Sequence, residues 1–328
     1  MKIAVDAMGG DHAPQEIVKG AILASELFPE IEKIFLVGSP TAIEPLLEKR
    51  NDKLEIVPAS EAITMEDHPG IAFRRKKDAS ITVAAKLVKS GEACALVSAG
   101  STGAQMVASL FTLGRIKGIE RPAIAIVLPT LEGGKLLLDA GANADCKVHN
   151  LIDFAKMGNI YAKKILGIEN PRIGLINIGS EATKGNELSI KAYEELSKIN
   201  NINFIGNIEG RDIPQGKCDV FVCDGFVGNV ILKLMEGMAK AFGTILKEEA
   251  NKSIRTKAGA ALMLPALKGI KNRMDYAEYG GAPLLGVDGI SIICHGSSKA
   301  KAIANAIRVA GECYSQGFIN ALKQVSEV

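Results

Sequence analysis

Several apolar stretches of the sequence end in short loops that are rich in glycine, serine and threonine. Ser98–Ala104 overlaps the end of the run Cys94–Ser98, and three further loops of this kind start at Asn177, Asp224 and His295. Where such a loop opens a helix, its backbone N–H groups and small side chains form a ready site for an anion. The loops supply these candidate phosphate-binding residues: Ser101, Thr102, Gly103, Ser180, Lys184, Ser297 and Ser298.

Each loop on its own also fits an ordinary turn with a serine cap. The sequence lacks both the dinucleotide pattern G-x-G-x-x-G and the phosphate-loop pattern that ends in Gly-Lys-Ser/Thr. Helix capping alone could account for one such loop. It accounts less well for four donor-rich turns that all lie at the ends of apolar runs. The sequence therefore predicts a ligand that carries phosphate.

Acidic, amide and imidazole side chains accompany these loops. Asp11 also fits a cap of the helix expected from Pro14, because proline favours the first helical turn. His68 and His149 have no partner at metal-ligand spacing, and no residue order resembles a nucleophile elbow or a catalytic triad. We therefore expect no metal site. The candidates that remain are Asp11, His12, Asp139, Asn143, Asn229 and His295.

The elements that must position these loops follow from hydrophobic periodicity. Apolar, β-branched runs alternate with amphipathic stretches, which predicts a three-layer, doubly wound α/β fold with a mainly parallel sheet. Ala123–Pro129 and Leu136–Ala140, joined by a turn with two glycines, predict an antiparallel hairpin within it. No linker composition divides the chain, so we expect a single domain over residues 1–328. The other predicted strands are Ile3–Ala7, Ile34–Val37, Leu54–Pro58, Cys94–Ser98, Ile173–Ile178, Phe204–Ile208, Val220–Cys223 and Ile290–His295.

Eight helices are expected between and after these strands. In such a sheet a ligand binds beyond the carboxyl ends of the strands, where the loops run into helix N-termini. The candidate residues above lie in loops of that kind. The helices are expected at Pro14–Leu27, Thr41–Glu48, Ile81–Ser90, Thr102–Leu113, Val148–Leu166, Glu187–Ile199, Asn229–Ala250 and Ser298–Leu322.

Composition narrows the class of protein. The 39 Lys and Arg residues nearly balance the 37 Asp and Glu residues, which argues against a globally basic nucleic-acid binder. Aromatic residues make up only 5% and tryptophan is absent, so stacking platforms for single-stranded nucleic acid are not expected. No stretch has the roughly 18 apolar residues of a membrane span, and the N-terminus does not resemble a signal peptide. These features predict a cytoplasmic protein with reduced cysteines.

One segment departs from the charge balance. Asn251–Arg273 contains six basic residues and no acidic one, and its centre is the uncharged run Ala258–Leu267. Basic flanks around a short apolar run suit shallow insertion into an anionic membrane surface. The alternative is a helical hairpin whose apolar residues pack in a dimer interface. We expect a protruding helical tip at about residues 235–273, with Leu262, Met263, Leu264 and Leu267 as its apolar contacts.

The motifs together resemble those of a known family. Ile3–Pro14 is similar to the opening of the bacterial acyl-[acyl-carrier-protein]:phosphate acyltransferases, the PlsX proteins. Further matches follow in order as far as residue 298, so the resemblance covers essentially the whole chain. The matching segments are Ser98–Ala104, Leu138–Asn143, Asn177–Gly185, Asp224–Asn229, Tyr279–Gly286 and His295–Ser298.

The resemblance implies an activity, a fold and a set of partners. The expected reaction transfers a long-chain acyl group from acyl carrier protein (ACP) to inorganic phosphate, without a cofactor, and yields acyl phosphate for phospholipid synthesis. The implied fold is that of phosphotransacetylases and isocitrate dehydrogenases. The implied protein is a homodimer, peripherally associated with the inner face of the membrane, that passes its product to a membrane glycerol-3-phosphate acyltransferase.

This chemistry suggests roles for the candidates. Phosphate is already anionic, so the site needs to hold it against the thioester carbonyl and to stabilise the developing oxyanion. Lys184 is expected to assist phosphate, Asn229 and Asn143 to face the thioester oxygen near Asp139, and His12 or His295 to protonate the leaving thiolate, with Asp11 orienting one of them.

Acyl carrier protein is strongly acidic, so a basic docking patch is also expected. Arg74–Lys77 is the candidate, although a solvated helix face explains this run equally well. Three other functions compete with the acyl-ACP enzyme: a short-chain phosphotransacetylase that uses acyl-CoA, a dehydrogenase on the related fold, and an inert membrane-surface scaffold.

Overall fold

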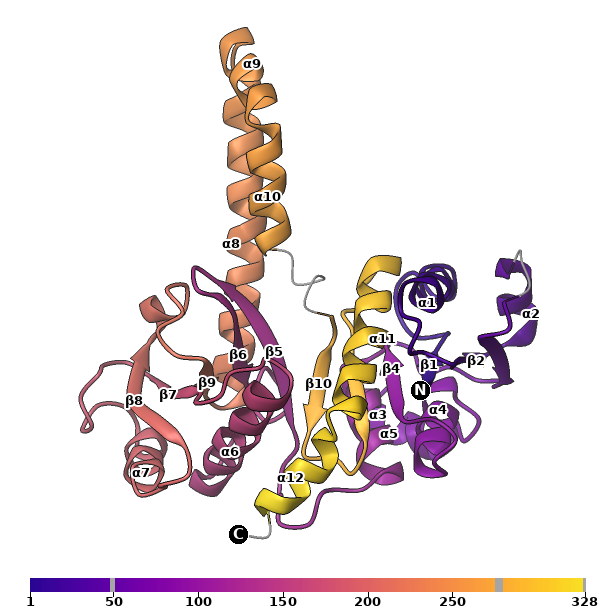
Figure 1. Cartoon of the computed structure of the whole chain (residues 1–328), viewed down its shortest axis with the longest axis horizontal. Coiled ribbons are helices and arrows are strands. Elements are labelled where there is room, and N and C mark those ends of the chain that lie inside the picture. Colours follow the sequence, from indigo (N-terminus) through magenta and orange to yellow (C-terminus); the bar gives the residue numbers. More distant parts are fainter. Residues whose placement is uncertain (48–50, 275–279, 327–328) are drawn as a thin grey trace.

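The computed structural model describes residues 1–47, 51–274 and 280–326. Eleven strands form one sheet in the order β3-β2-β1-β4-β11-β10-β5-β6-β9-β7-β8. Figure 1 shows helices on both sides of the sheet and a long helical arm that projects away from it. The strands are β1 Lys2–Asp6, β2 Lys33–Gly38, β3 Leu54–Pro58, β4 Ala95–Ser98, β5 Ala123–Thr130, β6 Gly133–Leu138, β7 Arg172–Asn177, β8 Asn203–Glu209, β9 Val220–Val222, β10 Ala282–Leu285 and β11 Ile290–Ile293.

The helices follow the strands in the order that the alternating pattern predicts. Short 3-10 turns at Glu44–Leu46 and Gly210–Asp212 complete the regular structure of the described residues. The α-helices are α1 Gln15–Leu27, α2 Pro40–Ile43, α3 Pro69–Arg75, α4 Ser80–Lys89, α5 Thr102–Thr112, α6 Val148–Lys164, α7 Glu187–Leu196, α8 Gly225–Asn251, α9 Ile254–Leu262, α10 Leu264–Met274, α11 Ala300–Ser315 and α12 Phe318–Ser326.

Five strands at one end of the sheet, β3, β2, β1, β4 and β11, run parallel. Alternate side chains of β1 point to opposite faces, as the strand period requires. Ile3 and Val5 belong to the core formed with α1 and α11, whereas Ala4 packs into a separate core with α4 and α5. This end of the molecule is therefore the three-layer arrangement that the sequence predicts.

The other end of the sheet, β6, β9, β7 and β8, is also parallel but runs the opposite way. Strand β10 pairs antiparallel with both β11 and β5, and β5 pairs antiparallel with β6. These three successive reversals orient β6 against β11. The helix α6 covers one face here and α8 the other, since Leu136 packs in the same core as Phe154 and Leu137 in the same core as Ile231. The β5–β6 pair confirms the predicted hairpin.

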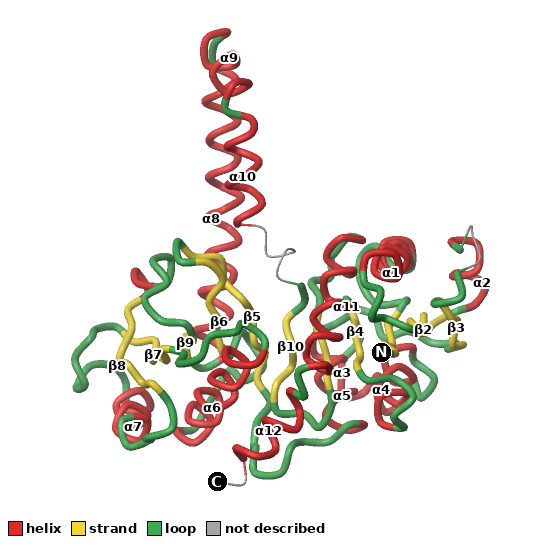
Figure 2. The backbone as a smooth tube through the Cα atoms, in the orientation of Figure 1, coloured by secondary structure: helices red, strands yellow, loops and turns green. Residues whose placement is uncertain are grey.

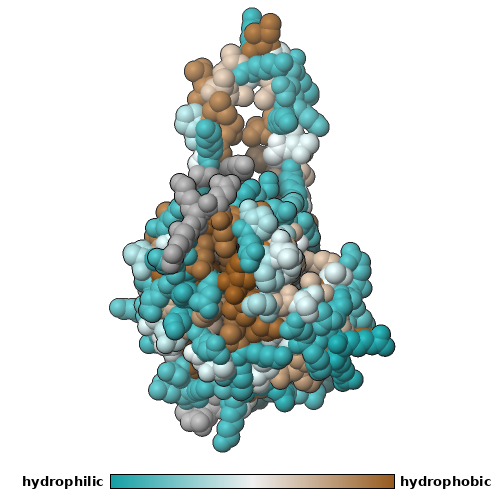
Figure 3. Space-filling view, turned by 90° about the vertical axis from the view of Figure 1, so that its right-hand side faces the viewer, coloured by the Kyte–Doolittle hydropathy of each residue, from teal (hydrophilic) through white to brown (hydrophobic). Residues whose placement is uncertain are grey.

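The arm consists of α8, α9 and α10 (Figure 2). Asp224 caps α8 by accepting a hydrogen bond from the N–H of Val227 at 2.8 Å, and Ser253 caps α9 by accepting from the N–H of Thr256. Leu262, Met263 and Leu264 are each more than half exposed at the end of the arm. Figure 3 shows this apolar surface among hydrophilic neighbours. No helix among the described residues is both long enough and apolar enough to span a bilayer.

Three sequence expectations need correction. The segment that contains Ala282–Leu285 is a central strand that the sequence analysis did not predict. Pro69–Arg75 forms the helix α3, which is not among the eight expected helices. The helix expected over Ser298–Leu322 is two helices, because Gly317 between them has a φ of 62°, which ends α11 and starts α12 in a new direction.

Candidate active site

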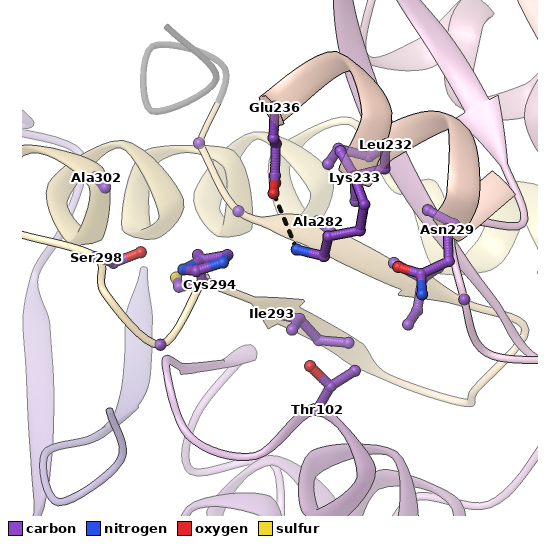
Figure 4. A pocket seen from close by; sticks show the side chains of 18 of the residues that line it. Thr102, Asn229, Leu232, Lys233, Glu236, Ala282, Ile293, Cys294, Ser298 and Ala302 are labelled. Carbon is purple, nitrogen blue, oxygen red and sulfur yellow. Dashed lines mark hydrogen bonds and ion pairs between the residues drawn. The ribbon is translucent and has the colours of Figure 1, made fainter. Parts of the chain in front are cut away.

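A pocket of about 520 Å³ lies where the two parallel ends of the sheet meet. Its floor includes the central strands β5, β10 and β11, and its walls come from the loops after β1, β4 and β11, from the loop after β6, and from α8. Figure 4 shows Thr102, Asn229, Lys233 and Ser298 arranged around this space. The volume suits a small-molecule ligand. Apolar residues line much of it, namely Ile124, Ile126, Val127, Leu232 and Ile293.

The N-terminus of α5 supplies backbone donors at one wall. Ser101 caps the helix weakly by accepting from the N–H of Ala104 at 3.5 Å, and Thr102 reaches the pocket. The first turn of a helix carries N–H groups without intrahelical partners, which favours an anion at this position. Gly103 is required for close packing, because a Cβ there would lie 2.8 Å from Cγ of Pro69.

Asp6 supports this wall from below. Its carboxylate is buried and accepts hydrogen bonds from the hydroxyls of Ser98 (2.7 Å) and Ser80 (2.6 Å) and from the N–H of Met8. Burial raises the pKa of the Asp6 carboxyl, and the hydroxyl donors act against that rise. The Asp6 side chain therefore ties the loops after β1 and β4 together beneath the pocket.

The turn after β11 forms the next part of the wall. His295, Gly296 and Ser298 line the pocket, and Ser297 stands beside them. The Nδ1 atom of His295 accepts from the N–H of Ser297 at 3.2 Å and lies 2.8 Å from its hydroxyl. With Nδ1 as acceptor, the ring proton of neutral imidazole resides on Nε2. Asp11 also lines the pocket, and its N–H donates to the carbonyl of Gly296 at 2.9 Å.

Asp139 organises the loop on the opposite wall. Its Oδ1 accepts from the N–H groups of Ile124, Gly141 and Ala142, and its Oδ2 accepts from both the N–H and the side-chain amide of Asn143. Burial raises the pKa of the Asp139 carboxyl. Both side chains are buried, and the amide of Asn143 also donates to the carbonyl of Pro122. Their polar atoms thus hold the loop, whose Ala140 and Gly141 reach the pocket.

Helix α8 brings an amide and an ion pair to the same space. Asn229, Leu232, Lys233 and Glu236 line the pocket from successive turns of the helix. Gly141 has a φ of 134° and lies against Asn229, so the loop after β6 fits closely beside this amide. The Nζ atom of Lys233 lies 2.9 Å from Oε2 of Glu236, as the dashed line in Figure 4 marks.

The structure brings together five of the residues that the sequence analysis singled out. Ser297 flanks this group, and Ser101 and Gly103 form the α5 N-terminus behind Thr102. The five that line the pocket are Asp11, Thr102, Asn229, His295 and Ser298.

Lys184, Ser180 and His12 are exposed and do not line this pocket. The first two belong to the loop after β7, and β9 separates β7 from β6, whose following loop reaches the pocket. Lys184 is held there by its backbone, since its carbonyl accepts from the side-chain amide of Asn177 at 2.9 Å. The functional roles of all three residues stay predictions.

Sequence reasoning missed Lys233 and Glu236. A signal was present, because residues three, four and seven positions apart lie on one face of a helix, and these two follow Asn229 at spacings of four and seven. The helix expected from Asn229 onward therefore places Lys233 and Glu236 on the side of Asn229 that faces the pocket.

A cysteine also lines the pocket, but it does not suit nucleophilic chemistry. Burial raises the pKa of the Cys294 thiol to about 12, which disfavours the reactive thiolate. Within the described ranges, no group of three or more histidine, cysteine or acidic residues has the arrangement of a metal site.

Comparisons with known proteins identify the family. Residues 1–321 match a protein family described as "Fatty acid synthesis protein". A phosphate acyltransferase of Heliobacterium modesticaldum is 62% identical, with 99% of this chain and 97% of that protein covered. The chain belongs to this phosphate acyltransferase family. It is thus an acyltransferase of fatty acid and lipid synthesis, as the sequence analysis predicted.

Solved structures agree on the fold of this phosphate acyltransferase. A phosphotransacetylase of Streptococcus pyogenes superposes with a TM-score of 0.66 at 16% identity, covering 95% of this chain and 93% of that one. A branched-chain phosphotransacylase of Enterococcus faecalis gives a TM-score of 0.61 at 16% identity, covering 94% and 98%. These likenesses confirm the phosphotransacetylase-like fold.

Proposed function

We propose that this phosphate acyltransferase binds a long-chain acyl-ACP and inorganic phosphate in the pocket and releases acyl phosphate and ACP. The supporting observation is the pocket itself, which combines apolar walls from Ile124, Val127 and Leu232 with donor groups at the α5 N-terminus and on α8. The acyl chain of the thioester needs the apolar walls. The phosphate and the developing oxyanion need the donor groups.

In the proposed reaction, a phosphate oxygen attacks the thioester carbonyl carbon and the carbon–sulfur bond then breaks. The thiolate leaves with the bonding electron pair and takes up a proton. The amide of Asn229 lines the pocket and suits stabilisation of the oxyanion. His295 lines the pocket and suits proton donation from its imidazolium form: the Nε2 proton passes to the thiolate and leaves the neutral ring, whose Nδ1 accepts from the N–H of Ser297.

The acidic carrier is proposed to dock on α3 and the end of α5. Arg74 and Arg75 are exposed, and the rings of Phe73 and Phe111 stack at 5.7 Å with Phe111 largely exposed. Lys76 instead pairs with Asp67 at 2.6 Å, which makes it part of the scaffold. This surface is next to the pocket, because Met65, which precedes α3 in the chain, is one of the residues that line the pocket. Cations around an apolar centre suit an acidic protein partner.

A homodimer is proposed through one side of α8. Phe226, Val230, Leu234, Met238 and Phe242 are each more than half exposed and recur every four residues. At about 100° per residue this stripe winds around the helix, so Phe226 starts close to the side that carries Asn229 and Lys233 and Phe242 ends about opposite Lys233. A contiguous exposed apolar stripe indicates a protein interface, and a second copy can cover its later part, Leu234, Met238 and Phe242, without closing the pocket.

The tip of the arm is proposed to contact the inner face of the cytoplasmic membrane. Its exposed Leu262, Met263 and Leu264 and the neighbouring basic residues support this proposal. Leu267, the other predicted contact, is partly buried on α10. An amphiphilic acyl phosphate would then pass to a membrane glycerol-3-phosphate acyltransferase. Residues 1–328 are proposed to act as one domain, which the continuous sheet supports.

The donor preference tests the proposed carrier. A long-chain acyl-ACP should give a higher kcat/KM than the corresponding acyl-CoA or acetyl-CoA, because only the carrier protein can use the α3 surface. A strong preference for acetyl-CoA would instead assign the chain a short-chain phosphotransacetylase activity. Lys184→Ala tests a separate prediction, that Lys184 assists phosphate although it does not line this pocket. An unchanged phosphate requirement would contradict that role.

A further inference from the structure

The strongest positive charge at the pocket comes from α8. Of the described residues that line the pocket, Lys233 alone carries a permanent positive charge, while Asp11 and Glu236 contribute carboxylates. An anionic substrate that enters here therefore needs either Lys233 or neutral donors to offset those carboxylates. Neutral donors are present at the α5 N-terminus, where Thr102 faces the same space.

The pair between Lys233 and Glu236 differs from an ordinary surface ion pair in its position. The Glu236 side chain is 18% exposed and that of Lys233 55%, whereas in the Lys252–Glu249 pair of the arm both side chains are more than half exposed. The more buried Glu236 anchors the long lysine side chain over the pocket. An ammonium group has three donors, and the hydrogen bond to Oε2 of Glu236 uses one of them.

We propose that Lys233 binds the inorganic phosphate substrate in this pocket and that Glu236 is a positioning residue that holds its ammonium group there. This inference rests on the proposed function and adds a residue to it. The phosphate lies between the Lys233 ammonium and the free N–H groups at the start of α5. Asn229 is one helical turn before Lys233. The same face of α8 therefore carries both the lysine proposed to bind the attacking phosphate and the amide proposed to stabilise the oxyanion.

The chemistry of a lysine side chain indicates which of the two substrates Lys233 affects. A lysine ammonium is a compact point charge that binds phosphate without fixing its orientation through a planar fork. The α5 N–H groups would supply that orientation. The charge of Lys233 is therefore expected to act mainly on phosphate affinity, and the thioester is expected to depend on the apolar walls instead.

Direct binding provides the first test. Inorganic phosphate is titrated into the full-length protein by calorimetry, with Lys233→Met compared to the wild type and to Lys240→Met. Lys240 is a matched control because it is an exposed lysine seven residues further along α8 that does not line the pocket. Lys233→Met should weaken phosphate binding by about 10- to 100-fold, the loss of one hydrogen bond to a charged group, and Lys240→Met by less than about twofold. Equal affinities for the two variants, or no binding by the wild type, would overturn the inference.

Kinetics provide the second test and separate this inference from the proposed function. With a saturating acyl donor, Lys233→Met should raise the KM for phosphate and leave the KM for the donor within about twofold. Glu236→Gln should change the phosphate KM in the wild-type background and leave it unchanged in the Lys233→Met background, because Glu236 acts through Lys233. An equal effect in both backgrounds would refute the positioning role. If Lys233-dependent phosphate binding occurs but no acyl donor yields acyl phosphate, the inference stands and the proposed function fails.

Discussion

Asp139→Asn should destabilise the protein strongly, although it changes only one atom of a buried side chain. The carboxylate accepts five hydrogen bonds, three at Oδ1 and two at Oδ2. The best amide orientation keeps the carbonyl oxygen at the Oδ1 position and places an NH₂ group against the two donors of Asn143. Two hydrogen bonds are lost and two buried donors lose their acceptor.

The magnitude follows from those two contacts. A hydrogen bond to a charged group contributes about 1.5 to 3 kcal/mol, so two of them give about 3 to 6 kcal/mol. Removing a buried charge offsets part of this loss, since burial already raises the pKa of the Asp139 carboxyl. We therefore expect the free energy of unfolding to fall by about 3 kcal/mol.

Urea denaturation measures this change. Asp145→Asn is the matched control, because Asp145 is an exposed acid on the same loop and its replacement should change stability by less than about 0.5 kcal/mol. A loss below about 1 kcal/mol for Asp139→Asn, with an unchanged denaturant slope, would contradict the assignment of Asp139 as the organiser of this loop.

Three further predictions concern the arm, the carrier surface and the acid stability. Leu262→Glu or Leu264→Glu should weaken binding to anionic vesicles by roughly 30-fold, the loss of about 2 kcal/mol for one inserted leucine, while dimerisation and turnover of soluble substrate persist; loss of the dimer would instead make the tip an interface. Charge reversal at Arg74 and Arg75 should lower kcat/KM for acyl-ACP by about three- to tenfold at low salt and less at high salt, and an unchanged value would return this run to a solvated helix face. At Asp219, burial opposes the charge, but hydrogen bonds from cationic neighbours outweigh it and lower the pKa from 3.8 to about 2. Its contribution to stability is therefore complete above the unfolded-state pKa and is lost as the pH falls toward 2, so Asp219→Asn should lose less stability than the wild type between about pH 4 and pH 2 in acid denaturation.

Elements with a clear hydrophobic period were predictable from the sequence. Leu54–Pro58 is predicted and observed over the same residues, and most other strands agree within one or two. Strand β10 was not predictable in this way, because it has only four residues and includes Pro283, which cannot donate to a sheet. Strand β10 pairs antiparallel with β11 and with β5, and the sequence of these four residues does not indicate which strands will be its neighbours.

The candidate site was predictable as a set of loops but not as a pocket. Thr102, His295 and Ser298 follow neighbouring strands, so their loops converge as expected. Lys184 follows a strand with the same kind of loop, yet it lies away from this pocket because strand order, which the sequence does not reveal, separates β7 from β6. Asn143 fits a contact with the thioester oxygen by residue type and Asp139 is expected near the thioester, but the structure uses the Asp139 carboxylate and the Asn143 amide to hold the loop.

Phosphate-dependent formation of acyl phosphate is the most direct test of the proposed function. The full-length protein is incubated with a long-chain acyl-ACP, with inorganic phosphate present or omitted, and acyl phosphate and free ACP are each quantified directly by mass spectrometry. We predict product and free ACP in equal amounts with phosphate, and neither without it. Folded protein that releases no acyl phosphate from acyl-ACP when phosphate is present would contradict the proposed reaction.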